Sequence, residues 1–373
     1  MTEICKGRIK HVFPGGNTSK GFYSFYDYII PLDTTRIFII KGGPGVGKST
    51  FMRKIGEAML ERGFDIEFHH CSSDNNSLDG VVIPTIGVAL IDGTAPHIVD
   101  PKNPGCVDEI IHLGDYWDED GMRLNKTEIL DANREVGRLF NRAYRFLKAA
   151  QVVYDDWERA NQEAMDYGKA NKIAADLIKK IFSRDISSKL GKERHLFASA
   201  ITPDGMMNYL ETIVGPCKKR FIIEGRPGTG KSTVLKKIAT AAIERGYDVE
   251  MYHCALNPEK VEHVVIPELS YAFTKSIEPH LYLSKDGDER IDMDYCLDAE
   301  ILEKYEKLVQ ENEEIFNSLF NRAIKFISQA KKTHDLMETY YIPNMDFEAI
   351  SQLWERTLDR IIGYAEEFGS KVS

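Results

Sequence analysis

The pattern of apolar and polar residues predicts two similar strand–loop–helix segments in one chain. Apolar runs at residues 36–40 and 220–223 have the length of buried strands, and each leads into a glycine-rich stretch. Apolar residues then recur at helical spacing in two sets, which are Phe51, Ile55, Met59 and Val234, Ile238, Ala242. Gly63 and Gly246 follow these helices and suit the left-handed conformation that ends many helices.

Further patterned segments complete an α/β plan. Residues 65–70 and 248–253 predict a second strand in each half, and residues 81–91 contain another strand. Strands and helices alternate, so we expect a mostly parallel sheet with helices on both faces. Residues 127–182 and 298–364 are long, charged and helix-periodic, with few glycines or prolines. We interpret them as a helical hairpin or bundle attached to each α/β core.

The role of these helical extensions stays open at this point. Polar helices of this kind most often form a solvated, packed layer, and a lid or a dimerisation arm is the alternative. Self-association or a protein partner bound through the arms is therefore one expectation to test. Asn125 and Glu128 have the spacing of a capping pair for the first long helix.

The two halves are copies of one unit. Residues 38–71 align with residues 221–254 at an offset of 183, with 20 identities over 34 positions. This period is too long for a solenoid repeat and indicates a duplicated domain. We place the boundary in a polar stretch, which gives domains at residues 1–187 and 188–373. The length of 373 residues agrees with about two domains.

Composition narrows the class of protein. The chain carries 58 acidic and 48 basic side chains, a formal net charge of -10, so a strongly basic nucleic-acid binder is not expected. Its longest apolar stretch, residues 81–91, is shorter than the about 20 residues that span a bilayer, so we expect no membrane segment. The start is polar, unlike a signal peptide, and six widely separated cysteines form no CxxC pair. These features predict a cytoplasmic protein with reduced thiols.

Two glycine-rich motifs carry the predicted chemistry. Both fit the pattern G-x-x-x-x-G-K-[ST], in which glycines let backbone N–H groups curl around phosphate oxygens. An apolar strand precedes each motif and an amphipathic helix follows it. The sequence here resembles the P-loop NTPase superfamily over the α/β core of each half, and it looks like a tandem P-loop ATPase. The residues that the resemblance assigns to nucleotide binding are Gly42, Gly43, Pro44, Gly45, Val46, Gly47, Lys48, Ser49, Thr50 and Gly225, Arg226, Pro227, Gly228, Thr229, Gly230, Lys231, Ser232, Thr233.

The resemblance implies ATP and Mg²⁺ as cofactors. Lys48 and Lys231 would reach the β- and γ-phosphates and act as catalytic lysines, while Ser49 and Ser232 would bind Mg²⁺ through their hydroxyl groups. Asn125 begins a near match to a guanine-reading Asn-Lys-x-Asp motif, but it follows no apolar strand and the second half lacks it. We therefore favour ATP over GTP.

An acidic residue at the end of a neighbouring strand should hold the metal. Asp92, after four apolar residues, is the predicted metal-binding and catalytic acid of the first half, although it could instead begin a turn with Gly93. Asp115 is the runner-up. Lys275 stands at the matching position of the second half and cannot bind Mg²⁺. Either a later acid, Asp292 or Asp294, substitutes, or the second site is impaired; a further alternative is that both halves use the later aspartates.

Histidines and arginines also match between the halves. The matched histidines are His11/His195, His70/His253 and His97/His280, and Cys71 matches Cys254. Structural hydrogen bonds explain them best; contact with substrate or phosphate comes second, and metal binding third because close ligand pairs are missing. Arg142 and Arg322 also match, and each is better explained as a surface helix residue than as an arginine finger.

Three functions follow from these patterns. The first is an ATP-binding, Mg-dependent NTPase that hydrolyses ATP, with a competent first site and an impaired second one. No glutamate follows Asp92 to activate water, which leaves room for a kinase that phosphorylates a nucleotide or another small-molecule acceptor. The third is a nucleotide-gated regulatory or scaffold protein in which binding shifts the helical arms.

Overall fold

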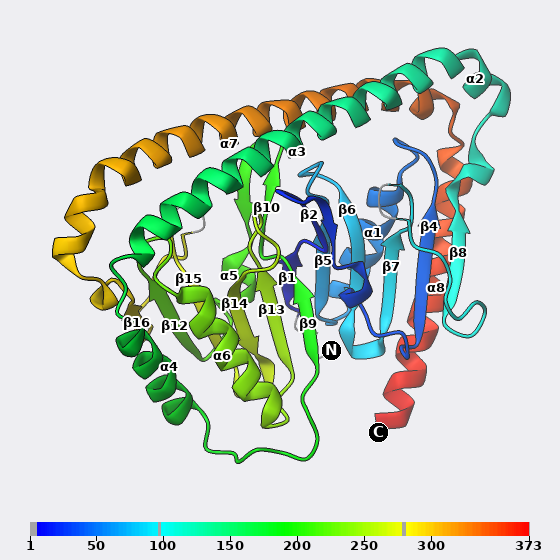
Figure 1. Cartoon of the computed structure of the whole chain (residues 1–373). Helices are drawn as coiled ribbons and strands as arrows, with labels where there is room; N and C mark the ends of the chain where they lie inside the picture. Colours follow the sequence, from blue (N-terminus) through cyan, green and yellow to red (C-terminus); the bar gives the residue numbers. More distant parts are fainter. Residues whose placement is uncertain (1–5, 96–97, 278–280, 373) are drawn as a thin grey trace. The chain divides into compact units, whose positions relative to one another are not determined.

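The computed structural model describes residues 6–95, 98–277 and 281–372 of an α/β chain (Figure 1). The described residues fall into two compact units. Unit 1 takes the chain up to residue 14, residues 24–140 and residues from 327 onwards, and unit 2 takes residues 15–23 and 141–326. Each unit is described by itself below.

The units draw on both copies of the sequence repeat. Helices α3 (Lys126–Gln162) and α7 (Ala299–Tyr341) each contain a boundary between the units, after Phe140 and after Phe326. The end of α3 and all of α4 (Tyr167–Ile181) therefore belong to unit 2, together with the sheet of the second copy. The end of α7 and all of α8 (Phe347–Val372) belong to unit 1. The predicted boundary at residues 187/188 marks the sequence repeat, and the compact units divide the chain elsewhere.

The described part of unit 1 contains a six-stranded mixed sheet. Its order is β1-β5-β6-β7-β4-β8, and β6 runs antiparallel to both of its neighbours. The other pairs are parallel. Residues 81–91, where the sequence indicates a strand, supply parts of two, because Pro84 starts the short helix η2 (Pro84–Ile86) between them. The strands are β1 (Ile9–Val12), β4 (Arg36–Lys41), β5 (Ile66–His70), β6 (Leu78–Ile83), β7 (Val88–Asp92) and β8 (Asp108–His112).

Unit 2 has the same topology. Its described strands pair in the order β16-β12-β15-β14-β13-β9, and the antiparallel strand, β14, takes the place that β6 has in unit 1. The matching order supports the duplication that the sequence predicts. The strands are β9 (Glu193–Leu196), β12 (Lys219–Glu224), β13 (Val249–His253), β14 (Val261–Ile266), β15 (Tyr271–Lys275) and β16 (Glu289–Asp292).

Short elements complete the two units. The hairpin strands are β2 (Gly15–Thr18) with β3 (Gly21–Ser24), and β10 (Ser199–Thr202) with β11 (Gly205–Asn208). The remaining helices are α1 (Lys48–Leu60), α2 (Glu119–Leu124), α5 (Leu210–Ile213) and α6 (Lys231–Glu244). The remaining 3₁₀ helices are η1 (Tyr26–Tyr28), η3 (Leu113–Tyr116), η4 (Pro267–Leu269), η5 (Asp294–Cys296) and η6 (Ile342–Asn344).

The main core of unit 1 lies on one face of its sheet. Phe38 and Ile40 of β4 pack there with apolar side chains of both α1 and α8. Ile37 and Ile39 point the other way, into a smaller cluster with Ile29 at the end of η1. The alternation of strands and helices predicts long helices on both faces of the sheet. The members of this smaller cluster come instead from strands, from the short helix η1 and from loops. The segment that covers it, residues 24–35, is short and holds Pro31, which leaves room for a single helical turn.

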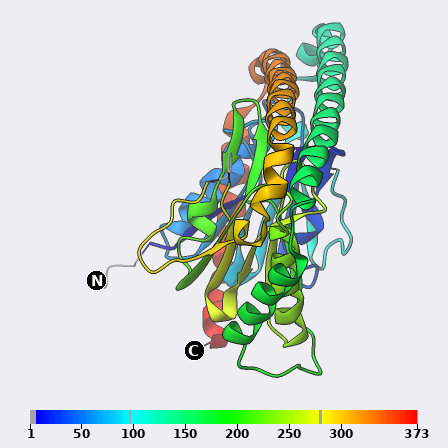
Figure 2. The same cartoon turned by 60° about the vertical axis from the view of Figure 1, so that its left-hand side comes forward.

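The predicted helical extensions are present, although their details differ from expectation. Residues 127–182 form most of α3 and α4, and residues 298–364 form α7 and much of α8. Within unit 2, the second part of α3 and the first part of α7 lie side by side (Figure 2), with Phe146 stacked on Phe326. Asn125 stands directly before α3, at the predicted position, where its backbone carbonyl accepts the N–H of Ile129 and its side-chain amide donates to the Gly121 carbonyl of α2 at 3.1 Å.

Candidate functional site

Loop 1 (residues 42–49) joins β4 to α1, and loop 2 (residues 225–232) joins β12 to α6. Both loops need glycine. Gly45 and Gly47 have φ of 69° and 90°, and Gly228 and Gly230 have φ of 85° and 79°, which L side chains rarely adopt. These are the strand–loop–helix settings that the sequence predicts.

The loops also leave no space for larger residues at their first position. A Cβ at Gly42 would lie 2.8 Å from the Val46 side chain, and one at Gly225 would lie 3.0 Å from the Thr229 hydroxyl oxygen. Val46 and Thr229 are themselves buried under the loops. The turns are therefore fitted to backbone alone, as a phosphate-binding loop requires. This is the respect in which the residues present fit a nucleotide.

The two predicted catalytic lysines fold back onto their loops. The Lys48 ammonium donates to the carbonyl groups of Gly42 and Gly43 at 3.0 and 2.7 Å. The Lys231 ammonium donates to the carbonyl groups of Gly225 and Arg226, each at 2.5 Å. Each lysine head group thus lies at the start of its own loop.

The serines of the two loops have different surroundings. Ser49 accepts the backbone N–H of Leu78, the first residue of β6, at 3.0 Å. Ser232 and Thr233 line a groove along α6, described below. Thr50 and Thr233 are exposed. Their predicted nucleotide contacts stay predictions.

Asp92 lies beside the first loop. Its carboxylate is 3.6 Å from the Lys48 ammonium, with 18% of its side chain exposed. It also accepts the N–H of Thr94 at 2.9 Å, so it starts the turn that was the alternative interpretation. Ser49 and Asp92 are the side chains that could hold a Mg²⁺ ion here. In the described ranges, no three His, Cys, Asp or Glu side chains gather as a metal site.

A buried acid beside this site is one that the sequence interpretation missed. Asp79 is 3% exposed. It is the extra residue of a bulge in β6, because His69 of β5 pairs with Gly80 and His70 pairs with Leu78. Bulges of this kind redirect a side chain. Burial raises the pKa of Tyr26, and the carboxylate of Asp79 raises it further. The sequence repeat contained a signal for this acid, because Glu262, the residue of the second half that matches Asp79, is also acidic.

Unit 2 places a buried ion pair where unit 1 has two acids. Glu262 occupies the same bulge position in β14, and its carboxylate is 2.7 Å from the ammonium of Lys275. The side chains are 2% and 12% exposed. Burial acts to lower the pKa of Lys275, but Glu262, with Tyr154 and Cys254, holds it above its ordinary value. Lys275 is therefore a fixed positive charge.

The lysine of loop 2 is affected by this second ammonium. Burial lowers the pKa of Lys231 to about 7, and the positive charge of Lys275 is the next largest cause. Asp294, Glu158 and Glu262 act in the opposite direction. The lysine of loop 2 is thus repelled by a second ammonium group, that of Lys275. Lys48 of loop 1 is instead attracted by the carboxylate of Asp92.

The later aspartates differ in position. Asp115 is exposed and bonded to His112 Nδ1 at 2.7 Å. Asp294 lies on loop 2, where its carboxylate accepts the backbone N–H of Arg226 at 2.7 Å. Asp292 accepts the N–H of Asp294 at 2.8 Å. Asp294 is thus the later acid that touches a loop, and it does so as an acceptor for the loop backbone.

Each loop is contacted by a long helix that the sequence interpretation did not place there. A Cβ at Gly43 would lie 2.4 Å from the Tyr341 ring, and one at Gly45 would lie 3.2 Å from Glu338, both residues of α7. At loop 2, the buried Asn161 of α3 donates its side-chain amide to the Pro227 carbonyl at 2.9 Å. In both units the covering helix comes from the other copy of the repeat.

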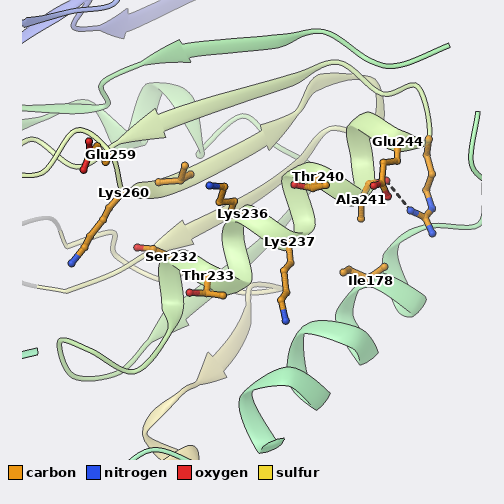
Figure 3. A pocket seen from close by; sticks show the side chains of 12 residues that line it. Ile178, Ser232, Thr233, Lys236, Lys237, Thr240, Ala241, Glu244, Glu259 and Lys260 are labelled. Carbon is orange, nitrogen blue, oxygen red and sulfur yellow. Dashed lines mark hydrogen bonds between the residues drawn. The ribbon is translucent and has the colours of Figure 1, made fainter. Parts of the chain in front are cut away.

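A groove runs along α6 in unit 2, with Ser232 and Thr233 at the start of the helix and Glu244 near its end (Figure 3). Its volume is about 570 Å³, which is within the range of small-molecule sites. Lys236, Lys237 and Lys260 add positive charge, and Glu244 and Glu259 partly balance it.

The matched histidines come together in pairs. His11 and His70 are joined by a hydrogen bond of 2.8 Å in unit 1, and His195 and His253 by one of 2.8 Å in unit 2. His253 Nδ1 also lies 2.6 Å from the Pro258 carbonyl, so Nδ1 is the donor, and Nε2 accepts from His195. Burial lowers the pKa of His70 to about 3 and that of His253 to about 4, and the partner ring adds to each shift. These four histidines therefore form hydrogen bonds within the protein, the role that the sequence favours for them.

The other matched residues divide into two groups. Arg142 lies over the Phe326 ring at 4.4 Å and Arg322 over the Phe146 ring at 5.1 Å, a reciprocal pair of cation–π contacts within unit 2. This is the helix-surface role expected for them. His97 and His280 lie outside the described residues. Cys71 and Cys254 follow the strands β5 and β13, and burial raises the pKa of Cys254 to about 12, so it is an unreactive thiol.

Comparison with known proteins adds no name to these features. No protein-family model, curated protein or solved structure matches the chain.

In the ranges that the structure describes, no helix combines the length and apolar character needed to cross a membrane. No disulfide joins the cysteines from Cys71 to Cys296.

Proposed function

We propose that the chain is an ATP-binding, Mg-dependent P-loop NTPase whose turnover takes place in unit 1. The observation that carries the proposal is the grouping of Lys48, Ser49 and Asp92 around a glycine loop whose φ angles and close contacts exclude side chains. Unit 2 repeats the loop and its lysine but has Lys275 in place of the acid. Unit 2 is therefore proposed as the impaired site.

The residues of unit 1 have separate tasks in this proposal. The backbone N–H groups of loop 1 bind phosphate oxygens, and the Lys48 ammonium moves from the loop carbonyls to the phosphates. Ser49 and Asp92 would hold Mg²⁺, which supplies positive charge for the phosphate oxygens when it is bound. Tyr341 and Glu338 of α7 lie against Gly43 and Gly45 of the loop.

ATP turnover by the wild type, Lys48→Ala and Lys231→Ala tests this assignment. We expect Lys48→Ala to reduce phosphate release at least about a hundredfold and Lys231→Ala to keep most of it. The reason is that the strand-end acid Asp92 lies beside Lys48, whereas the matching strand end in unit 2 carries Lys275. Equal losses in the two variants would contradict a single active unit. A panel of nucleoside and sugar acceptors in the same assay distinguishes a kinase, because an acceptor would then accelerate the consumption of ATP.

A nucleotide-gated regulator is the second candidate. The contacts of Asn161 with loop 2 and of Tyr341 with loop 1 favour it, since a nucleotide that reshapes a loop would act directly on α3 or α7. Binding of ATP without turnover, together with a nucleotide-dependent change in the protease sensitivity of α3 and α7, would select this candidate over the enzyme.

A further inference from the structure

We propose that unit 2 binds the phosphate chain of a nucleotide without a divalent cation, with the Lys275 ammonium taking the place of the metal. This inference rests on the proposed function, because it requires that loop 2 binds a nucleotide. It adds the chemical form of the ligand, a metal-free nucleoside di- or triphosphate, and the side chain that decides this form.

The register of the sheets places Lys275 at the metal position. Lys275 pairs with Ile223 of β12, as Asp92 pairs with Ile40 of β4 in unit 1. Both residues end the strand next to the one that leads into the loop. In unit 1 the carboxylate of Asp92 lies 3.6 Å from the loop lysine. The charge at this position is reversed in unit 2.

The reversed charge is held in place by a built contact. Glu262, redirected inwards by the bulge in β14, binds the Lys275 ammonium at 2.7 Å, and both side chains are nearly removed from water. A buried pair with this geometry keeps its charges and its position. The carboxylate that could otherwise have bound a metal is thereby occupied by a protein cation.

The acids around loop 2 are engaged with protein groups, which leaves these carboxylates occupied when a divalent cation approaches. Lys231 and Lys275 contribute two ammonium groups, and the positive charge of Lys275 acts on Lys231. The nearby acids are already engaged: Glu262 with Lys275, Glu158 with Lys260, and Asp294 with the Arg226 backbone. A bound phosphate chain would relieve the repulsion between the lysines, whereas Mg²⁺ would add to it.

Nucleotide binding with and without metal tests the inference in single-unit variants. Lys48→Ala leaves unit 2, and Lys231→Ala leaves unit 1; a fluorescent ATP analogue is titrated into each in excess Mg²⁺ and in EDTA. We expect EDTA to change the affinity of Lys48→Ala by less than about threefold, and to weaken Lys231→Ala at least about tenfold. A loss in EDTA as large for Lys48→Ala as for Lys231→Ala would overturn the inference and leave the proposed function standing. If neither variant nor the wild type binds in either buffer, the proposed function itself fails.

A second set of variants separates the role of the ion pair from folding. In the Lys48→Ala background, Lys275→Met with Glu262→Gln removes both charges together, so no buried charge is left alone. We expect this variant to bind at least about tenfold more weakly in EDTA with a similar melting temperature. Lys285→Met, which removes an exposed lysine paired with Glu211, is the matched control and should change nothing. Unchanged EDTA binding by the double replacement would show that Lys275 serves structure alone.

A replacement that copies unit 1 gives the opposite result if the inference holds. Lys275→Asp with Glu262→Asp gives unit 2 the two acids that unit 1 has at Asp92 and Asp79. In the Lys48→Ala background, we expect the binding of the ATP analogue to become dependent on Mg²⁺. Binding that stays independent of Mg²⁺ would contradict the assignment of Lys275 as the deciding residue.

Discussion

Loops 1 and 2 have the same backbone and opposite electrostatic surroundings. Their glycines adopt the same left-handed angles, their lysines donate to the same carbonyl positions, and their sheets have the same strand order. The difference lies in two matched positions, where Asp79 and Asp92 of unit 1 correspond to Glu262 and Lys275 of unit 2. The replacement of an acid by a lysine at the position of Asp92 thus accompanies the change from a predicted metal site to a pair of lysines beside loop 2.

The largest expected effect comes from moving the lysine of unit 2 into unit 1. Asp92→Lys should reduce ATP turnover by about a thousandfold or more, because it removes a predicted metal ligand and adds a positive charge where a carboxylate now lies 3.6 Å from the Lys48 ammonium. Phosphate release measures this. Asp92→Asn is the matched control for charge and should retain more activity than Asp92→Lys; equal activity would mean that the added charge is irrelevant.

Acid should destabilise both units through their histidine pairs. The folded pKa values of about 3 for His70 and about 4 for His253 lie below the ordinary value of 6.5, so the unfolded chain binds more protons between these values. The stabilisation is complete above pH 6.5 and is lost as the pH falls towards 3 to 4. At pH 5 the loss is about 2 kcal/mol for each of these rings.

Denaturant unfolding at pH 7 and pH 5 measures this pH dependence. Replacing one pair with neutral side chains, His11→Asn with His70→Gln, should remove the contribution of unit 1 and leave that of unit 2. A wild-type stability that is the same at both pH values would contradict the assignment of neutral, buried rings.

A smaller effect separates the two loop lysines by pH. Because the pKa of Lys231 is about 7, its charged form declines as the pH rises from 6 to 8, and an anion on loop 2 loses one favourable charge. Lys275, Asp294, Glu158 and Glu262 are the other charged groups that act on Lys231. We expect the affinity of Lys48→Ala for the ATP analogue to fall up to about tenfold over this range. An affinity that rises with pH would contradict the assignment.

An effect of similar size concerns the helix that covers loop 2. Asn161→Ala should lower the free energy of unfolding by about 1–2 kcal/mol, because it leaves the buried Pro227 carbonyl without its amide donor. The same replacement at Asn171, an exposed residue bonded to Lys237, is the control and should cost less. Thermal unfolding of both variants measures the difference.

Local sequence patterns predicted the loops and helices well. The glycine motifs, the preceding apolar strands and the helical spacing of Phe51, Ile55 and Met59 depend on neighbours in the chain, and they place α1 and α6 correctly. Asp92 and Lys275 were also recognised as different, because the repeat aligns them residue by residue. The fold class follows from the same local order.

Long-range features escaped the sequence interpretation. The reversal of β6 depends on a short turn at Pro84 within an apolar run that reads as one strand. Asp79 was missed because a β-bulge, which no periodicity reveals, turns this residue inwards. Helical periodicity identifies α3 and α7 as helices, but it carries no information about which loop they contact. Partners of this kind are set by tertiary packing and not by local propensity.

The exchange of helices between the copies has a consequence for ancestry. A single copy of the repeat contains a loop and a sheet, yet the helix that covers its loop belongs to the other copy. Before duplication, such a chain would have completed itself on a second identical chain, as domain-swapped homodimers do. Joining two such copies in one chain would let the loops diverge, because a mutation in one loop would no longer have to appear in both.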